Sequence, residues 1–141
     1  MKLKLLLSVC LLSLCCQLQA HDARPLSVTI VEQGVELYRV IVRAPPTLQV
    51  QNAPQLVWPE QCEILESSAL SGALGSVSLV SCQSGLAGSL LQLDYPEFNP
   101  SLTALFRLER LNGMSLTSIL PPDRLNWEVP TASSLAGIAA Q

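Results

Sequence analysis

LTALFRLERLNGMSLTSIL, residues 102–120, is the stretch that decides the fold class. Apolar residues recur at every second position of its first half, which places them on one face of a strand: Leu102, Ala104, Phe106 and Leu108. Asn112-Gly113 follows, and this pair between two such runs is a strong signal for a tight hairpin turn. The apolar residues of the returning strand are Met114, Leu116 and either Ile119 or Leu120. The stretch therefore predicts a β-hairpin.

The same alternation recurs in five further stretches, which are 26–34, 35–46, 76–82, 89–96 and 124–130. Their inward-facing residues are predicted to include Leu26, Val28, Ile30, Tyr38, Val40, Val42, Leu125, Trp127 and Val129. Ten prolines and seven glycines separate the runs, and no window before residue 133 has a helical period. We therefore expect an all-β fold, an antiparallel immunoglobulin-like (Ig-like) β-sandwich of about seven short strands over residues 21–130. Residues 131–141 are predicted to form a flexible tail or linker.

The N-terminal 20 residues have the three parts of a secretory signal peptide. Lys2 and Lys4 precede an apolar run over residues 5–16, and a polar stretch then ends in the small residue Ala20. The run is shorter than the about 20 residues that a membrane-spanning helix needs. We expect cleavage after Ala20 and a periplasmic or other extracytoplasmic location for the mature chain. Cys10, Cys15 and Cys16 leave a lipoprotein anchor as the weaker alternative, because no Gly, Ala or Ser precedes any of them.

The mature chain is acidic and contains no lysine. Beyond residue 20 it carries six arginines against eleven carboxylates, a formal charge of −5. Proteins that bind nucleic acid present a basic surface to the phosphates, so nucleic acid is excluded as the expected partner.

Two cysteines, Cys62 and Cys82, remain after the predicted cleavage. In an oxidising compartment their expected state is one disulfide, which would stabilise the fold by about 3 kcal/mol for a loop of this length. A pair of metal thiolates is the alternative. Structural zinc sites bring four ligands in closely spaced pairs, and the chain has neither a CxxC pair nor a second histidine.

His21, the single histidine of the chain, would be the first residue after cleavage. Its imidazole and the new α-amine, with the Asp22 carboxylate, would form a weak, open site for copper or nickel. The alternative is that His21 is an ordinary polar residue at the start of the mature chain. The carboxylates Glu60, Glu63 and Glu66 are assigned to solvated loops, because no nucleophile or histidine accompanies them. We therefore expect no catalysis and no small-molecule substrate, and an exported hydrolase that uses Glu60 and Glu63 is the remote alternative.

The order of five short motifs resembles the N-terminal extracytoplasmic region of HupE/UreJ-like membrane proteins. The motifs are AHDARP (20–25), PEQC (59–62), QSGLAG (83–88), LTALFRLERLNG (102–113) and LPPDRLNWEVP (120–130). The matching residues are His21, Arg24, Pro25, Cys62, Cys82, Gly85, Leu86 and Gly88. Most of these have expected structural roles: Gly85 and Gly88 in turns, Leu86 in the core beside the disulfide, and Pro25 before the first strand.

The resemblance implies a β-rich domain that precedes a bundle of membrane helices in a family linked to hydrogenase and urease maturation. Nickel transport is suggested for the membrane part, whose histidine and aspartate motifs have no counterpart among these residues. We therefore expect a non-catalytic accessory domain at the inner membrane, either truncated or free-standing, that interacts with a membrane protein or with a missing membrane domain. Arg24 is a candidate docking residue. The alternative function is a small periplasmic protein that binds copper or nickel through His21.

Overall fold

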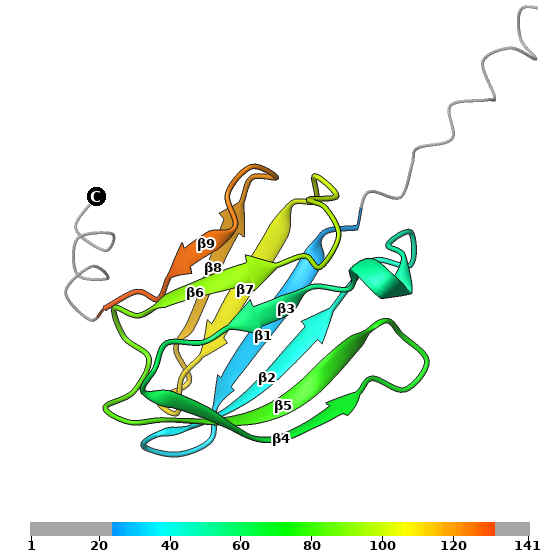
Figure 1. Cartoon of the computed structure of the whole chain (residues 1–141). Coiled ribbons are helices and arrows are strands. Elements are labelled where there is room, and N and C mark those ends of the chain that lie inside the picture. The colour runs from blue at the N-terminus through cyan, green and yellow to red at the C-terminus, as the bar shows by residue number, and fades with distance from the viewer. Residues whose placement is uncertain (1–23, 132–141) are drawn as a thin grey trace, which may run out of the picture.

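In the computed structural model, which describes residues 24–131, nine strands form two sheets (Figure 1). The strands are β1 (Leu26–Glu32), β2 (Leu37–Arg43), β3 (Gln55–Val57), β4 (Cys62–Ala69), β5 (Gly75–Cys82), β6 (Leu90–Asp94), β7 (Ala104–Glu109), β8 (Ser115–Leu120) and β9 (Asn126–Glu128). The large sheet has the order β4-β5-β2-β1-β7-β8, and the small sheet has the order β3-β6-β9. The small sheet lies over one face of the large one, which makes the predicted β-sandwich (Figure 1).

Two details of the predicted topology are wrong. The fold has nine strands in the described residues instead of about seven, and one pair is parallel, because β1 runs alongside β7 with Leu26 opposite Ala104. The additional strands are β3, which is too short to show a period, and β4, in which every residue after Cys62 is exposed. Side-chain alternation shows which face of a strand is buried but not which strand is its neighbour or in which direction that neighbour runs. The remaining pairs are antiparallel, as expected.

The hairpin at 102–120 forms as predicted. Arg110 N–H donates to the Met114 carbonyl at 2.8 Å, and Gly113 has φ +84°, so a three-residue turn joins β7 to β8. The sequence did not decide whether Ile119 or Leu120 faces inward. Leu120 is buried, whereas Ile119 is 69% exposed. The prediction for Met114 is wrong: it lies in the turn before β8 begins and is exposed.

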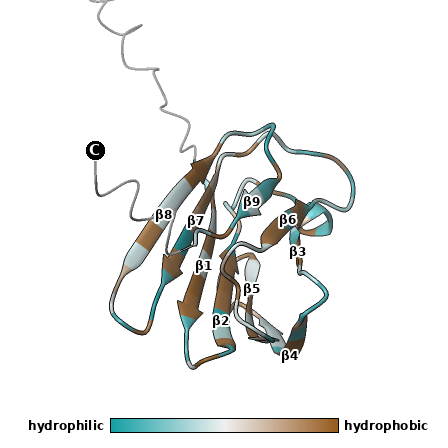
Figure 2. Cartoon of the chain, turned by 90° about the vertical axis from the view of Figure 1, so that its left-hand side faces the viewer, coloured by the Kyte–Doolittle hydropathy of each residue, from teal (hydrophilic) through white to brown (hydrophobic). Residues whose placement is uncertain are grey.

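The core forms between the sheets from the predicted faces of the strands. Phe106 of the large sheet stacks on Trp127 of the small sheet, with ring centroids 4.7 Å apart and both side chains buried. Other predicted inward residues that are buried are Leu26, Val28, Ile30, Tyr38, Val40, Val42, Ala104, Leu108 and Val129. Figure 2 shows apolar residues concentrated in the strands and polar residues at most of the turns.

Asn52 is the one buried polar residue in the described part of the chain, and it fixes the segment that leads into β3. Its side-chain amide donates to the Phe98 carbonyl at 2.9 Å. Its side-chain oxygen accepts from Glu97 N–H at 3.0 Å and from Phe98 N–H at 3.3 Å. Since buried polar groups are destabilising unless they are hydrogen-bonded, these three contacts tie the turn before β3 to the loop after β6.

Gly75, at the start of β5, is the described glycine at which an added side chain would have the least space. Its φ is +148°, and a Cβ atom there would lie 1.9 Å from the Val42 carbonyl oxygen. We expect Gly75→Ala to lower the free energy of unfolding by about 2 kcal/mol or more, because a backbone atom cannot move aside as a flexible side chain would. Chemical denaturation followed by far-UV circular dichroism measures this loss.

Gly72 provides the matched control in the same hairpin. Its φ is +71°, but a Cβ atom there would have no neighbour within 4 Å. Gly72→Ala should therefore lose only about 1 kcal/mol, from the left-handed backbone alone. Equal losses in the two variants would show that the close approach to Val42 does not determine the residue at position 75.

Candidate functional site

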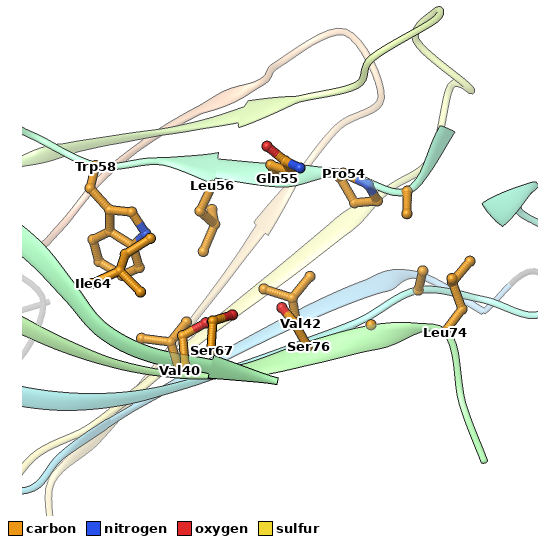
Figure 3. Close-up of a pocket in the computed structure, with 14 residues that line it drawn as sticks. Val40, Val42, Pro54, Gln55, Leu56, Trp58, Ile64, Ser67, Leu74 and Ser76 are labelled. Atoms are coloured by element: carbon orange, nitrogen blue, oxygen red, sulfur yellow. The ribbon is translucent and has the colours of Figure 1, made fainter. Parts of the chain in front are cut away.

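An open cleft of about 410 Å³ lies between the two sheets at the side formed by β3 and β4 (Figure 3). Strands β2, β4 and β5 form its floor, and the segment from Ala53 to Trp58 forms its roof. Its apolar lining consists of Val40, Val42, Ala44, Ala53, Pro54, Leu56, Trp58, Ile64 and Leu74. Its polar lining consists of Gln55, Ser67, Ser76 and Ser78. We call this the inter-sheet cleft.

The cleft is open because small residues replace large ones on the inner face of β5. Towards its end, β5 turns Val80 and Cys82 into the core, and both are fully buried. Towards its start, the same face carries Ser76 and Ser78, and Ser78 shares a hydrogen bond of 3.0 Å with Ser67 of β4. Serine side chains cannot fill the space between the sheets, so the sandwich is packed at one end of β5 and open at the other.

Apolar side chains face one another across the opening. Leu56 and Trp58 project from the roof towards Val40 and Val42 of β2, and Trp58 lies beside Ile64 of β4 (Figure 3). Ile64 is 50% exposed, while Leu56 and Trp58 are only partly buried. A partly exposed tryptophan next to partly exposed aliphatic residues is typical of a surface that binds a partner.

Strands β3 and β4 each have one neighbour among the described strands, so both borders of the cleft have a free edge. On β4 the register shifts between Ile64 and Glu66, which is a β-bulge. Glu63 and Glu66 lie opposite Ser81 and Leu79, on the outer face of the sheet. The prediction that these two carboxylates lie in a loop is therefore wrong, since both belong to a strand, whereas Glu60 does lie in a turn; all three are exposed, as expected.

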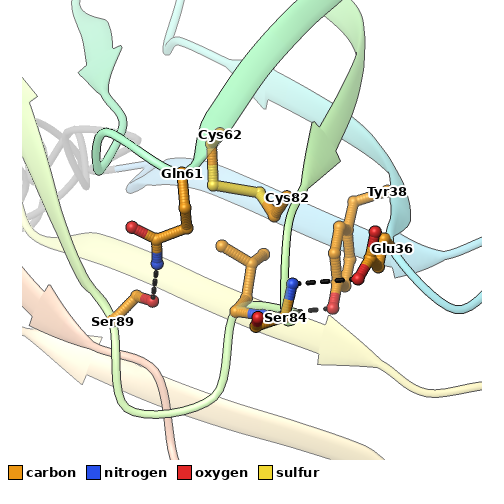
Figure 4. The surroundings of a disulfide bond; sticks show 8 residues. Glu36, Tyr38, Gln61, Cys62, Cys82, Ser84 and Ser89 are labelled. Atoms are coloured by element: carbon orange, nitrogen blue, oxygen red, sulfur yellow. Dashed lines mark hydrogen bonds between the residues drawn. A yellow bond between two sulfur atoms is a disulfide. The ribbon is translucent and has the colours of Figure 1, made fainter.

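The disulfide is confirmed, and it lies at the end of the β4–β5 hairpin that is farthest from the turn. Cys62 at the start of β4 is directly opposite Cys82 at the end of β5, and their sulfur atoms are bonded (Figure 4). The bond thus joins neighbouring strands of one sheet, whereas the disulfide of antibody domains crosses between the two sheets. It anchors the edge strand that forms one wall of the inter-sheet cleft.

The QSGLAG motif forms the turn that follows Cys82. Gly85 and Gly88 have φ values of +78° and +74°, and Leu86 is 2% exposed, so the expected turn and core positions are present. Leu86 N–H donates to the Tyr38 hydroxyl oxygen at 3.2 Å, and Ser84 N–H donates to a Glu36 carboxylate oxygen at 3.0 Å (Figure 4). These contacts fasten the turn to the start of β2.

A smaller hollow of about 320 Å³ adjoins this turn and contains Glu32, Glu36, Tyr38 and Arg110. Glu32 accepts a hydrogen bond from Leu111 N–H, as Glu36 does from Ser84 N–H. Burial raises the pKa of the Tyr38 hydroxyl, and the hydrogen bond from Leu86 lowers it only in part. Tyr38 is therefore neutral at physiological pH, and the carboxylates are already used to hold loops.

The residues that match the resemblance lie at two separate places. Arg24 and Pro25 are exposed and line a shallow depression with Pro45 and Pro46, next to the start of β1. Leu86 contacts Tyr38, which pairs with Glu32 at the far end of β1. The two groups of residues are thus separated by the seven-residue length of β1 and do not form one site.

His21 and Asp22 lie outside the described residues, so the copper or nickel site stays a prediction. Within residues 24–131, no group of three or more His, Cys, Asp and Glu side chains could hold a metal ion. The same residues include no helix that is long and apolar enough to cross a membrane.

Sequence patterns alone did not identify the inter-sheet cleft. One signal for it is present: Ser76 and Ser78 occupy the positions of β5 that would complete the apolar face of Val80 and Cys82. Small polar residues at such positions indicate that this end of the inward face is not filled by apolar side chains. Comparisons with protein-family models, with curated proteins and with solved structures found no match to this chain.

Proposed function

We propose that this chain is a non-catalytic, exported accessory domain that binds a membrane protein, and that the inter-sheet cleft is its binding surface. The single observation that carries the proposal is the position of an apolar cleft between two strands that each have a free edge. The resemblance to the extracytoplasmic region of HupE/UreJ-like proteins supports a partner in the membrane. The disulfide supports an oxidising compartment.

An extended segment of the partner is the ligand that fits this geometry. Free backbone groups along β3 would hydrogen-bond to such a segment, as in other cases of strand addition. Alternate side chains of the segment would then enter the cleft between Leu56, Trp58 and Ile64. Because β3 has only three residues and lies between Pro54 and Pro59, the contact is short and its specificity comes from the side chains.

The chemistry of the cleft supports binding rather than catalysis. Its lining contains serine hydroxyls but no carboxylate, histidine or arginine that would activate or position them. Serine without a neighbouring base is a weak nucleophile, and Ser67 and Ser78 are hydrogen-bonded to each other.

Site-specific photo-crosslinking in the host cell tests the proposal. The full chain, with its N-terminal segment, would carry benzoylphenylalanine in place of Leu56 or of Ile64, on opposite walls of the cleft. We expect both positions to form an adduct with the same membrane protein. The matched control is Leu79, which lies on β5 but on the outer face opposite Glu66, and it should form none.

A second variant separates specific binding from contact by chance. Trp58→Ala removes the largest apolar side chain of the cleft, and we expect it to lower the adduct yield at least about tenfold, as for a tryptophan at the centre of an interface. Adducts of equal yield from Leu79, different proteins at Leu56 and Ile64, or no effect of Trp58→Ala would each overturn the proposal.

A further inference from the structure

Strand β8 is an edge strand of the large sheet, and it differs from the other three edge strands of the two sheets, β3, β4 and β9. The outer strands β3 and β9 have three residues each, and β4 carries Glu63, Glu66 and a bulge. Short length, charge and bulges are the features by which proteins prevent unwanted pairing at sheet edges. β8, with the sequence SLTSIL, has six residues, no charge, no proline and a continuous register with β7. Its outer face includes Ile119, which is 69% exposed.

The hydrogen bonds of the hairpin show which backbone groups of β8 point to the free edge. Arg110 N–H bonds to the Met114 carbonyl, and hydrogen-bonded pairs alternate with non-bonded pairs along an antiparallel ladder. The next bonded pairs of the register are therefore those of Leu116, Ser118 and Leu120 with β7. Ser115, Thr117 and Ile119 consequently direct their N–H and C=O groups away from β7.

We propose that β8 pairs with β8 of a second copy of this chain, antiparallel across a two-fold axis at Thr117. In this register Thr117 faces Thr117 of the other copy, and Ser115 faces Ile119. Each of the three residues donates one hydrogen bond and accepts one, so the two copies form six backbone hydrogen bonds. The two six-stranded sheets become one sheet of twelve strands.

The register is set by the residues that flank β8. A shift of two residues towards the C-terminus would place Pro121, which has no N–H, opposite Ser115. A shift of two residues in the other direction would require Gly113 N–H, which already donates to the Arg110 carbonyl at 3.0 Å. Only the register centred on Thr117 uses every free donor and acceptor of the strand.

Charge favours a second copy as the occupant of this edge. Pairing β8 with itself brings no charged residues of the strand together, and the nearest charges on the outer face, Arg107 and Glu109 of β7, are paired at 3.0 Å. Self-pairing of β4 would instead bring carboxylates of the two copies close together. A six-residue edge buries less area than a standard interface, which is typical of weak or transient association.

The dimer has a consequence for the proposed function without depending on it. Strands β4 and β8 are the opposite ends of the large sheet, so pairing through β8 leaves the inter-sheet cleft of each copy open. Two clefts at the two ends of one twelve-stranded sheet would engage two partner segments at once, which raises the overall affinity when both can bind.

Sedimentation velocity of the purified full chain over a series of concentrations tests the dimer. We expect a monomer–dimer equilibrium whose dissociation constant rises at least about tenfold in Thr117→Lys, because two ammonium groups would meet at the axis. Thr117 is exposed, so this variant should keep the circular dichroism spectrum of the native protein. The matched control is Ser68→Lys on β4, also exposed at a sheet edge, which should leave the dissociation constant unchanged.

Cross-linking tests the register independently of stability. In a chain with Ser in place of Cys10, Cys15 and Cys16, Thr117→Cys should give a covalent dimer with a short bis-maleimide reagent, whereas Ser68→Cys should not. A monomer at every concentration, a dimer that Thr117→Lys does not weaken, or a dimer that Ser68→Lys weakens equally would overturn the pairing through β8. None of these results bears on the photo-crosslinking from Leu56 and Ile64, so the two proposals fail separately.

Discussion

Trp127→Ala should lower the free energy of unfolding by about 3–5 kcal/mol, the range for removal of a large aromatic side chain from a core. Trp127 is 5% exposed, and its ring stacks on that of Phe106, which is fully buried. The two rings belong to different sheets, so the substitution removes packing area and a contact that holds the sandwich together. For a domain of this size, the loss corresponds to a fall of roughly 15 °C or more in the midpoint of thermal unfolding.

Far-UV circular dichroism is the suitable measurement, because the substitution removes one of the two tryptophans on which a fluorescence signal would depend. Two controls isolate the cause. Asn126→Ala, at the exposed neighbouring position of β9, should change stability by less than about 0.5 kcal/mol. Trp58→Ala, at the other tryptophan, should lose clearly less than Trp127→Ala because its ring lies at the open cleft. A loss below about 0.5 kcal/mol for Trp127→Ala would mean that the small sheet is not held by this ring.

The residues that form the core could be predicted because a half-buried strand leaves a period of two in the sequence. Val28, Val40 and Phe106 each lie in such a run, and all are buried. The disulfide was predictable for a different reason, since the two cysteines beyond a predicted signal peptide are expected to pair with each other. The turns at Gly85 and Gly113 followed from the conformations that only glycine adopts easily.

The arrangement of the strands could not be predicted, because it depends on contacts between distant residues. The parallel pair of β1 and β7 joins Leu26 to Ala104, and the chain visits both sheets between them. The sequence of neither strand indicates which strand lies beside it. Strand β4 was missed because its stability comes from the ladder with β5 and from the disulfide, not from a buried face of its own.

The cleft could not be predicted because it arises from side chains that are too small to fill the space between the two sheets. Ser76 and Ser78 continue the inward face of β5, but their small size has meaning only once β3 is known to lie across from them. The resemblance identified Arg24, Pro25 and the QSGLAG turn instead, and none of these residues lines the cleft. The contacts of the QSGLAG turn fasten it to Tyr38 of β2 and to Cys82 at the end of β5, as expected for residues that maintain a fold.

Breaking the disulfide should have the second largest effect and should act on the cleft as well as on stability. Cys62→Ala is expected to lower the free energy of unfolding by about 3 kcal/mol, because the unfolded chain regains the freedom of a loop of about 20 residues. In the folded state the same bond holds β4, an edge strand whose residues after Cys62 are all exposed. Few buried contacts of its own would keep β4 on β5 without the bond, so this strand should open first.

Thermal unfolding under oxidising and reducing conditions measures the first effect, and amide hydrogen exchange measures the second. Native protein treated with reductant is the matched control, since it has every side chain and lacks only the bond; its unfolding midpoint should fall to that of Cys62→Ala. Amides of β4 should exchange faster in both samples, while those of β1 and β7 in the middle of the large sheet should lose protection only with global unfolding. If reductant leaves the midpoint and the β4 amides unchanged, the packing of Ile64 beside Trp58, not the disulfide, must keep this wall of the cleft in place.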